Sequence, residues 1–186
     1  MGIPTLITTN THAVGSSTTT STFTSGIDST YDEYMFVFTD INPDTNNAIF
    51  RFQVNVAGQS GYNEVITSTF FQTSMTETGT LTTVSYDTGG DQAQGSADQY
   101  LSGGIANDAD ASAAGILHLF SPSDTTYVKH FYSRSNTYNI SIGGSGNATY
   151  DVYVAGYINV TGAVDEVQFD TNNGDFSGVI QMYGIS

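Results

Sequence analysis

The sequence predicts an all-β protein: an antiparallel β-sandwich of the jelly-roll kind with an extended N-terminal arm. β-branched and aromatic residues alternate with polar ones at period two along most of the chain, which indicates half-buried strands. Clusters of Gly, Asn, Asp and Pro separate these runs at short intervals, as in folds built from many short strands. No stretch has apolar residues at the spacing of an amphipathic helix.

Residues 25–56 show this alternation most clearly. Two aromatic runs flank the segment INPDTNN at 41–47. This segment favours a turn, because Pro43 fixes φ and Asn or Asp side chains bond to their own backbone. We therefore predict a β-hairpin with its aromatic face in the core. The residues predicted to face inward are Tyr34, Phe36, Phe38, Phe50, Phe52, Val54 and Val56.

The rest of the chain predicts further strands, roughly nine to eleven in total. Residues 115–133 form the clearest second hairpin, since Pro122 suits the second position of a type I turn. Residues 87–114 have the weakest periodicity and are predicted mostly as loop, with a short strand near 99–101. Long loops of this kind are often functional. The other predicted strands are 65–71, 81–86, 137–142, 150–160, 164–169 and 178–185.

Residues 1–24 are predicted to form an N-terminal arm, followed by a single sandwich domain at 25–186. The Ser/Thr run at 16–22 cannot bury enough apolar surface to order itself. Two interpretations of the arm remain open. It could add a strand to its own sheet, or it could lie on a neighbouring subunit. The apolar side chains proposed for protein interaction are Ile3, Leu6, Ile7 and Phe23.

Charge and composition exclude several classes of function. The net charge is −15, from 18 acidic and 3 basic residues. Binding to phosphate groups or anionic lipids requires several Lys or Arg, so we expect no nucleic acid and no membrane partner. The absence of Cys excludes disulfides and thiolate chemistry. No signal peptide or membrane-spanning run is visible, so we expect synthesis in a cytoplasm.

The chain shows no recognisable catalytic motif. The available imidazole bases are His12, His118 and His130, and a G-x-S-x-G nucleophile elbow is missing. His118 and His130 lie in one predicted hairpin. They could form a metal-binding pair or a pH switch, but we favour a structural role for both histidines. Asp165 and Glu166 are adjacent in a predicted strand and would point to opposite faces, which disfavours a glycosidase pair. We predict no catalytic residues, no cofactor and no enzyme activity.

Two further features concern ligands. Segment 107–112 has oxygen ligands at alternate positions but lacks the Gly and Glu of an EF-hand loop. This segment has two possible interpretations, a calcium site that departs from the EF-hand pattern or a solvated acidic loop. We favour the solvated loop and predict no metal site. Most Tyr and Phe residues lie at alternating strand positions, where core filling is expected, whereas loop aromatics are free to stack on sugars. The candidates for ligand contact are Tyr62, Tyr100 and Tyr138.

Four segments carry a resemblance to a known group of proteins: 25–46, 115–138, 155–170 and 178–185. Together they resemble small virion structural proteins of tailed phages, chiefly phages of cyanobacteria and other marine bacteria. The resemblance implies a non-enzymatic virion protein made in the host bacterial cytoplasm. It also implies other virion proteins as partners, either the major capsid protein or tail proteins, together with further copies of the chain.

The resemblance leaves the place on the particle open. Phage fibres commonly contain repeats, coiled coils or collagen-like stretches, and this chain has none. We therefore expect a capsid decoration or cement protein that docks with help from its arm. The alternative is a tail or tail-fibre-associated component, or a module that binds host-surface glycans.

Overall fold

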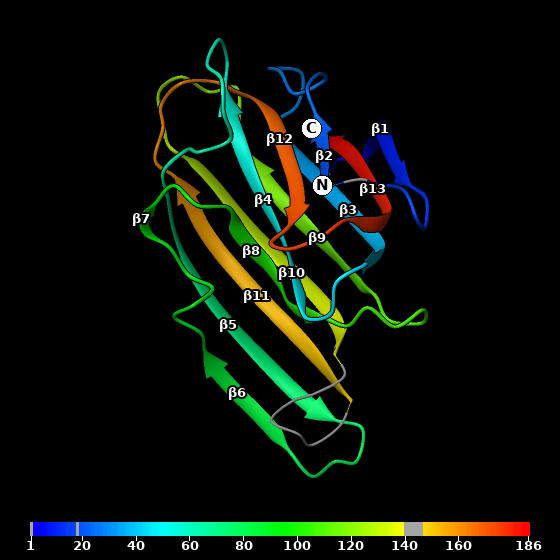
Figure 1. Ribbon diagram of the computed structural model, residues 1–186. Helices are drawn as coiled ribbons and strands as arrows, with labels where there is room; N and C mark the ends of the chain where they lie inside the picture. Colours follow the sequence, from blue (N-terminus) through cyan, green and yellow to red (C-terminus); the bar gives the residue numbers. More distant parts are fainter. Residues whose placement is uncertain (1, 18, 140–146) are drawn as a thin grey trace.

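The computed structural model describes residues 2–17, 19–139 and 147–186. The described residues form thirteen strands in two antiparallel sheets that pack face to face (Figure 1). This confirms the predicted β-sandwich. The two sheets are unequal, because one has nine strands and the other has four. No helix that could cross a membrane occurs in the described part of the chain.

Most neighbouring strands are distant in sequence. The large sheet has a main order of eight strands, and β7 (Ala93–Gly95) pairs with β5 (Ile66–Thr76) outside this order. That order is β1 (Thr5–His12), β13 (Phe176–Ile185), β3 (Glu33–Pro43), β9 (Ala113–Phe120), β10 (Lys129–Asn139), β11 (Ala148–Ile158), β5 (Ile66–Thr76) and β6 (Thr82–Tyr86). The small sheet has the order β2 (Thr20–Phe23), β12 (Val164–Thr171), β4 (Ala48–Val56) and β8 (Gln99–Ile105).

The hairpin predicted at 25–56 is wrong. β3 pairs with β13 and β9 in the large sheet, whereas β4 pairs with β12 and β8 in the small one. The chain crosses between sheets at 44–47, and Phe38 and Phe50 meet across the core with ring centroids 5.1 Å apart. Period-two alternation identifies the buried face of a strand. It cannot distinguish two strands that are neighbours in one sheet from two strands whose buried faces meet across the core.

The second predicted hairpin is confirmed, since β9 and β10 pair antiparallel with Leu119 opposite Phe131. The strand predicted at 137–142 is the end of β10 as far as Asn139, and the remainder lies outside the described residues. Within 87–114, the short strand expected near 99–101 extends to Ile105 as β8. The remaining predicted strands correspond to β5, β6, β11, β12 and β13.

The core is an aromatic cluster centred on Phe169 of β12. Its ring lies 5.6 Å from Phe50 in a stacked arrangement and 5.3 Å from Phe36. Phe23 and Phe52 lie at 6.1 and 6.4 Å. These five side chains come from four strands in both sheets, and each is at most 2% exposed. Burial of such large rings is the main stabilising term of the sandwich.

The N-terminal arm pairs within its own molecule. β1 runs antiparallel to β13, with Thr5 opposite Gly184 and His12 opposite Gly178. β2 runs antiparallel to β12 and places Phe23 in the core. The arm therefore contributes an edge strand to each sheet. Of the two interpretations of the arm, the structure shows the first, in which the arm adds strands to the sheets of its own molecule.

The large sheet extends beyond the small one at the end formed by β5 and β6 (Figure 1). The inward faces of these strands are polar there, and the Ser74 and Thr83 hydroxyls hydrogen-bond to each other at 2.5 Å. Polar side chains suit this region because strands of the small sheet do not cover it. The overhang leaves β6 at the free margin of the nine-stranded sheet.

Candidate functional site

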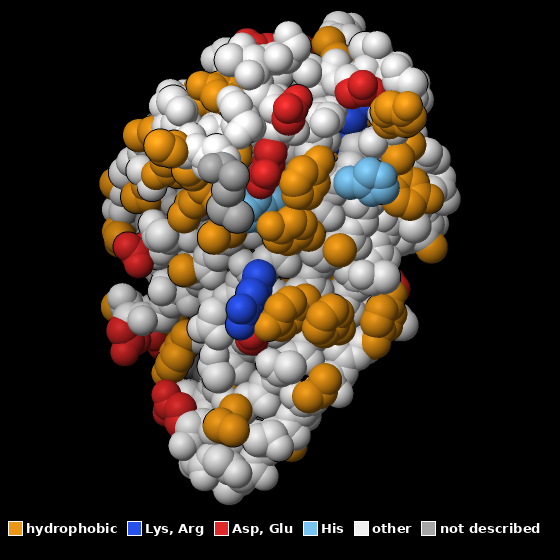
Figure 2. All heavy atoms as spheres, turned by 180° about the vertical axis from the view of Figure 1, so that it is seen from behind, with side chains coloured by type: hydrophobic (Ala, Val, Ile, Leu, Met, Phe, Trp, Pro, Cys, Tyr) orange, Lys and Arg blue, Asp and Glu red, His pale blue; other side chains and the backbone are white. Residues whose placement is uncertain are grey.

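The outer face of the large sheet carries most of the exposed large hydrophobic side chains of the described residues. Ten large hydrophobic side chains are exposed in the described residues, and seven of them lie on this face according to the strand register. Figure 2 shows that hydrophobic side chains gather over the middle of this face, around cationic and histidine side chains. Such a concentration indicates an interaction surface. We call it the outer apolar face: Leu6, Phe71, Met75, Val84, Tyr86, Ile116 and Tyr132.

A row of opposed residues crosses this face. Phe71 and Tyr153 stack with ring centroids 4.8 Å apart and an interplanar angle of 3°. On the other side of Tyr153, the Arg134 guanidinium lies 5.0 Å from the ring centroid. The Tyr153 ring is thus covered by the Phe71 ring on one face and by the Arg134 guanidinium on the other. Such contacts between side chains of neighbouring strands stabilise a sheet. The row presents mainly ring edges outward, an arrangement better suited to protein contact than to stacking of a sugar on a ring.

Adjacent aromatic residues in sequence could have identified this face. Phe70 and Phe71 are consecutive in β5, and Phe131 and Tyr132 are consecutive in β10. Successive side chains of a strand point to opposite faces, so one aromatic of each pair must point outward. The default expectation that strand aromatics fill the core holds for Phe70 and Phe131, each 2% exposed, whereas their neighbours are exceptions that point outward.

The three basic residues all have partners within the chain. Arg134 forms an ion pair with Asp151 at 2.8 Å, and its hydrogen bonds lower the pKa of that carboxyl. Lys129 is fully buried, and its Nζ donates to backbone carbonyls, the nearest being that of Tyr127 at 2.6 Å. Burial lowers the pKa of Lys129. An anionic ligand would have to compete with these partners.

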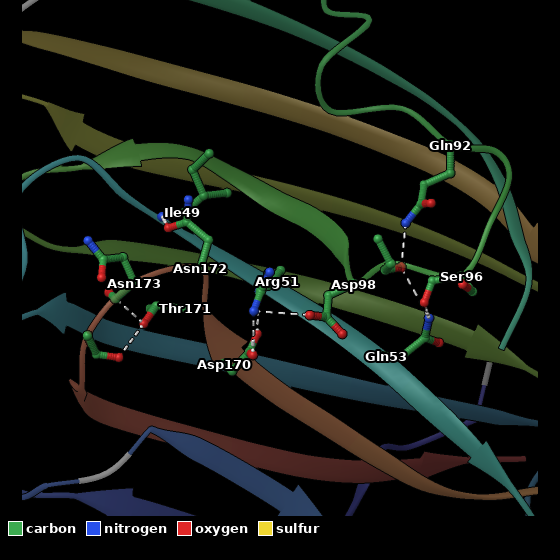
Figure 3. Close-up of polar contacts among 12 residues, drawn as sticks. Ile49, Arg51, Gln53, Gln92, Ser96, Asp98, Asp170, Thr171, Asn172 and Asn173 are labelled. Carbon is green, nitrogen blue, oxygen red and sulfur yellow. Dashed lines mark hydrogen bonds and ion pairs between the residues drawn. The ribbon is translucent and has the colours of Figure 1, made fainter. Parts of the chain in front are cut away.

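The third basic residue, Arg51, joins strands of the small sheet (Figure 3). Its guanidinium donates to Asp170 of β12 at 2.7 and 2.8 Å and forms an ion pair with Asp98, just before β8, at 3.1 Å. Burial raises the pKa of Asp170, and Arg51 opposes this shift. Beside this cluster, Gln53 donates to the Ala97 carbonyl at 3.2 Å and holds the segment before β8. These groups bind one another and have a structural role.

The histidines do not form a shared site. His118 and His130 both point to the outer face, but His118 lies opposite Tyr132 and His130 lies opposite Tyr157. The His118 ring stacks on Tyr132 at 4.5 Å, and its Nδ1 contacts the Glu33 carboxylate. Burial lowers the pKa of His12, in β1. Among the described residues, no group of three or more His, Cys, Asp or Glu side chains is arranged to hold a metal.

Segment 107–112 is held by hydrogen bonds from an amide. Asn42 Nδ2 donates to the carbonyls of Asp108 and Ala111 at 3.0 and 2.7 Å. Asn107 Nδ2 in turn donates to the Asp44 carbonyl at 3.1 Å. Asp110 is exposed. The contacts thus join this loop to the crossing between β3 and β4.

The three ligand candidates lie on different elements. Tyr62 is in a loop and donates to Glu166 at 2.8 Å. Tyr100 is in β8 opposite Arg51 of the small sheet, and Tyr138 is in β10 of the large sheet. Tyr100 and Tyr138 are therefore strand residues rather than loop residues. The structure brings none of the three together.

The four arm residues proposed for protein interaction also separate. Ile3 is 88% exposed and Leu6 is 50% exposed, so both are accessible to a partner. Leu6 lies opposite Tyr183 and belongs to the outer apolar face. Ile7 packs against the core at a bulge in β1, and Phe23 is 2% exposed. As a core side chain, Phe23 is not accessible for partner contact, which corrects that part of the prediction.

The environment of Tyr62 predicts a late titration. Burial, the hydrogen bond to Glu166 and the nearby carboxylates raise the pKa of Tyr62 to about 12. The unfolded value is about 10, so this tyrosine stabilises the fold below pH 10 and loses that contribution as pH rises towards 12. We expect Glu166→Gln to lower the pKa of Tyr62 but to leave it above 10, because burial remains.

Phenolate absorbance measured against pH would test this expectation, with the Tyr62→Phe curve subtracted to isolate one tyrosine. The same variant serves as a control in alkaline unfolding, since it lacks the titrating group. An unchanged Tyr62 pKa in Glu166→Gln would contradict the role given to the carboxylate.

Comparisons with known proteins add no relatives. The chain matches no protein-family model, no curated protein and no solved structure.

Proposed function

We propose that the chain is a non-enzymatic structural protein of a tailed-phage virion, a decoration or cement protein that docks on the capsid through its outer apolar face. The observation that carries the proposal is the concentration of seven exposed large apolar side chains on one face of a broad sheet. Ile3, 88% exposed just before β1, lies beyond the strand that carries Leu6. The resemblance of four segments to virion proteins supports the virion assignment, and the absence of fibre-type repeats favours the capsid over the tail.

Charge defines the kind of capsid surface that would suit this face. The chain has a net charge of −15, and its cations are held by internal partners. A partner with an apolar centre and a rim of Lys or Arg would therefore complement it. Opposite charge at the rim would speed association and orient the two surfaces. The apolar centre would supply most of the affinity.

Binding to particles tests the proposal. Purified chain is added to particles of the phage that encodes it, prepared without this protein, and bound chain is quantified against concentration. Ile116→Asp places a charge in the centre of the face, and we expect an affinity at least about tenfold lower. Val14→Asp is the matched control, since Val14 is 88% exposed but outside the outer apolar face, and it should bind like the unmodified chain.

Each other outcome counts against part of the proposal. Equal binding by both variants would exclude the outer apolar face as the docking surface. Binding confined to tails in electron micrographs would reject the capsid location in favour of the tail alternative. Failure to bind any particle would overturn the virion assignment.

A further inference from the structure

At the margin of the large sheet, β6 presents backbone groups that pair with no other strand of the described residues. It pairs with β5 on one side, and no described strand lies on the other. The Leu81 carbonyl accepts from Thr76 N–H at 3.0 Å, and Asp87 N–H donates to the Phe70 carbonyl at 3.0 Å. Inward and outward backbone groups alternate in an antiparallel strand. The N–H and C=O groups of residues 82, 84 and 86 therefore point away from the sheet.

β6 also lacks the features that usually protect an edge strand. Its sequence is TTVSY, without charge or Pro, and its pairing with β5 has no register shift. Val84 is 81% exposed and Tyr86 is 53% exposed. Charges, Pro and bulges are the common ways of blocking edge-to-edge pairing. β1, at the opposite margin of the sheet, has a bulge between Leu6 and Thr8. β6 is thus the more regular of the two margins.

We propose that two copies of this chain pair through β6, antiparallel, about a twofold axis at Val84. Val84 then lies opposite Val84 of the second copy, and Thr82 lies opposite Tyr86. Residues at these positions carry the outward backbone groups, so each opposed pair exchanges two hydrogen bonds. In Figure 1 no other labelled strand lies beyond β6 on the side away from β5.

This register separates like charges. Asp87, the acid directly after β6, lies opposite Leu81 of the second copy. The two Asp87 carboxylates are then six residues apart along the strands, about 20 Å at the usual rise. The screening length at physiological salt is about 8 Å, so their repulsion is largely screened. Because each copy carries a net charge of −15, dimerisation should strengthen as salt increases.

The contact is short, so we expect weak, concentration-dependent dimers of the purified chain. Sedimentation equilibrium of the full chain at low and high NaCl would measure the monomer–dimer equilibrium. Val84→Pro removes an outward N–H and should raise the dimer Kd at least tenfold. Val84→Lys should act in the same direction through charge, and Val84→Thr should retain the dimer. Circular dichroism should show the same strand content for all variants.

Several results would overturn this interface. A chain that remains monomeric at high concentration and high salt has no such pairing. Dimers that persist in both Val84→Pro and Val84→Lys use another surface, and loss of the dimer in Ile116→Asp would identify the outer apolar face instead. The proposal is independent of particle docking, because it concerns the purified chain alone.

Discussion

Replacing Phe169 by alanine is expected to lower the free energy of unfolding by about 3–5 kcal/mol. The Phe169 ring lies within 6.4 Å of the rings of Phe23, Phe36, Phe50 and Phe52, so its removal leaves a cavity lined by both sheets. A loss of this size is a large fraction of the stability of a typical domain. Urea unfolding followed by circular dichroism would measure it.

Phe71→Ala is the control for this prediction. Phe71 is 43% exposed on the outer face and stacks on one neighbouring ring, Tyr153. We expect a loss of about 1 kcal/mol, the usual worth of a cross-strand aromatic pair. If Phe71→Ala proved as costly as Phe169→Ala, the position of the core between the two sheets would be in error.

Deletion of residues 1–24 is expected to abolish cooperative folding. It removes β1 and β2 and uncovers Phe36 and Phe169, which Phe23 contacts at 5.3 and 6.1 Å. It also exposes new strand edges on β12 and β13, which favour aggregation. Thermal unfolding and light scattering of the truncated chain would reveal a broad or missing transition and aggregated material.

A point variant separates the structural role of the arm from a docking role. Ile3→Asp changes a side chain that is 88% exposed, so the melting temperature of this variant should match that of the unmodified chain. A truncated chain that melted at the same temperature would show that the arm is dispensable for folding. Particle binding is therefore better tested with surface variants than with the deletion.

The fold class was predictable because alternation reports directly on burial. All seven residues predicted to face inward in β3 and β4 are at most 6% exposed. The choice of sheet for each strand was not predictable, since Phe38 and Phe50 satisfy the same pattern whether they are neighbours or face each other across the core. Strand pairing depends on contacts between distant segments, which periodicity does not record.

The outer apolar face was harder to predict from the sequence than the fold class. Leu6 and Phe23 were both predicted to contact a partner because both are apolar, and only strand register places Leu6 outward and Phe23 inward. Phe71 and Tyr132 lie at strand positions, where core filling was the general expectation for aromatic residues. The free margin at Val84 depends on which strand ends the sheet, a property of the complete topology.

The pairing of β1 with β13 affects the order in which the chain can fold. β1 pairs with β13, the described strand farthest from it along the chain, and Phe23 of β2 needs Phe169 of β12 to complete its packing. Closing such long loops is entropically costly and slows folding. During synthesis β1 and β2 must remain without their partner strands until β13 and β12 have emerged from the ribosome. Chaperones that shield exposed apolar segments should therefore engage this nascent chain until β13 is available.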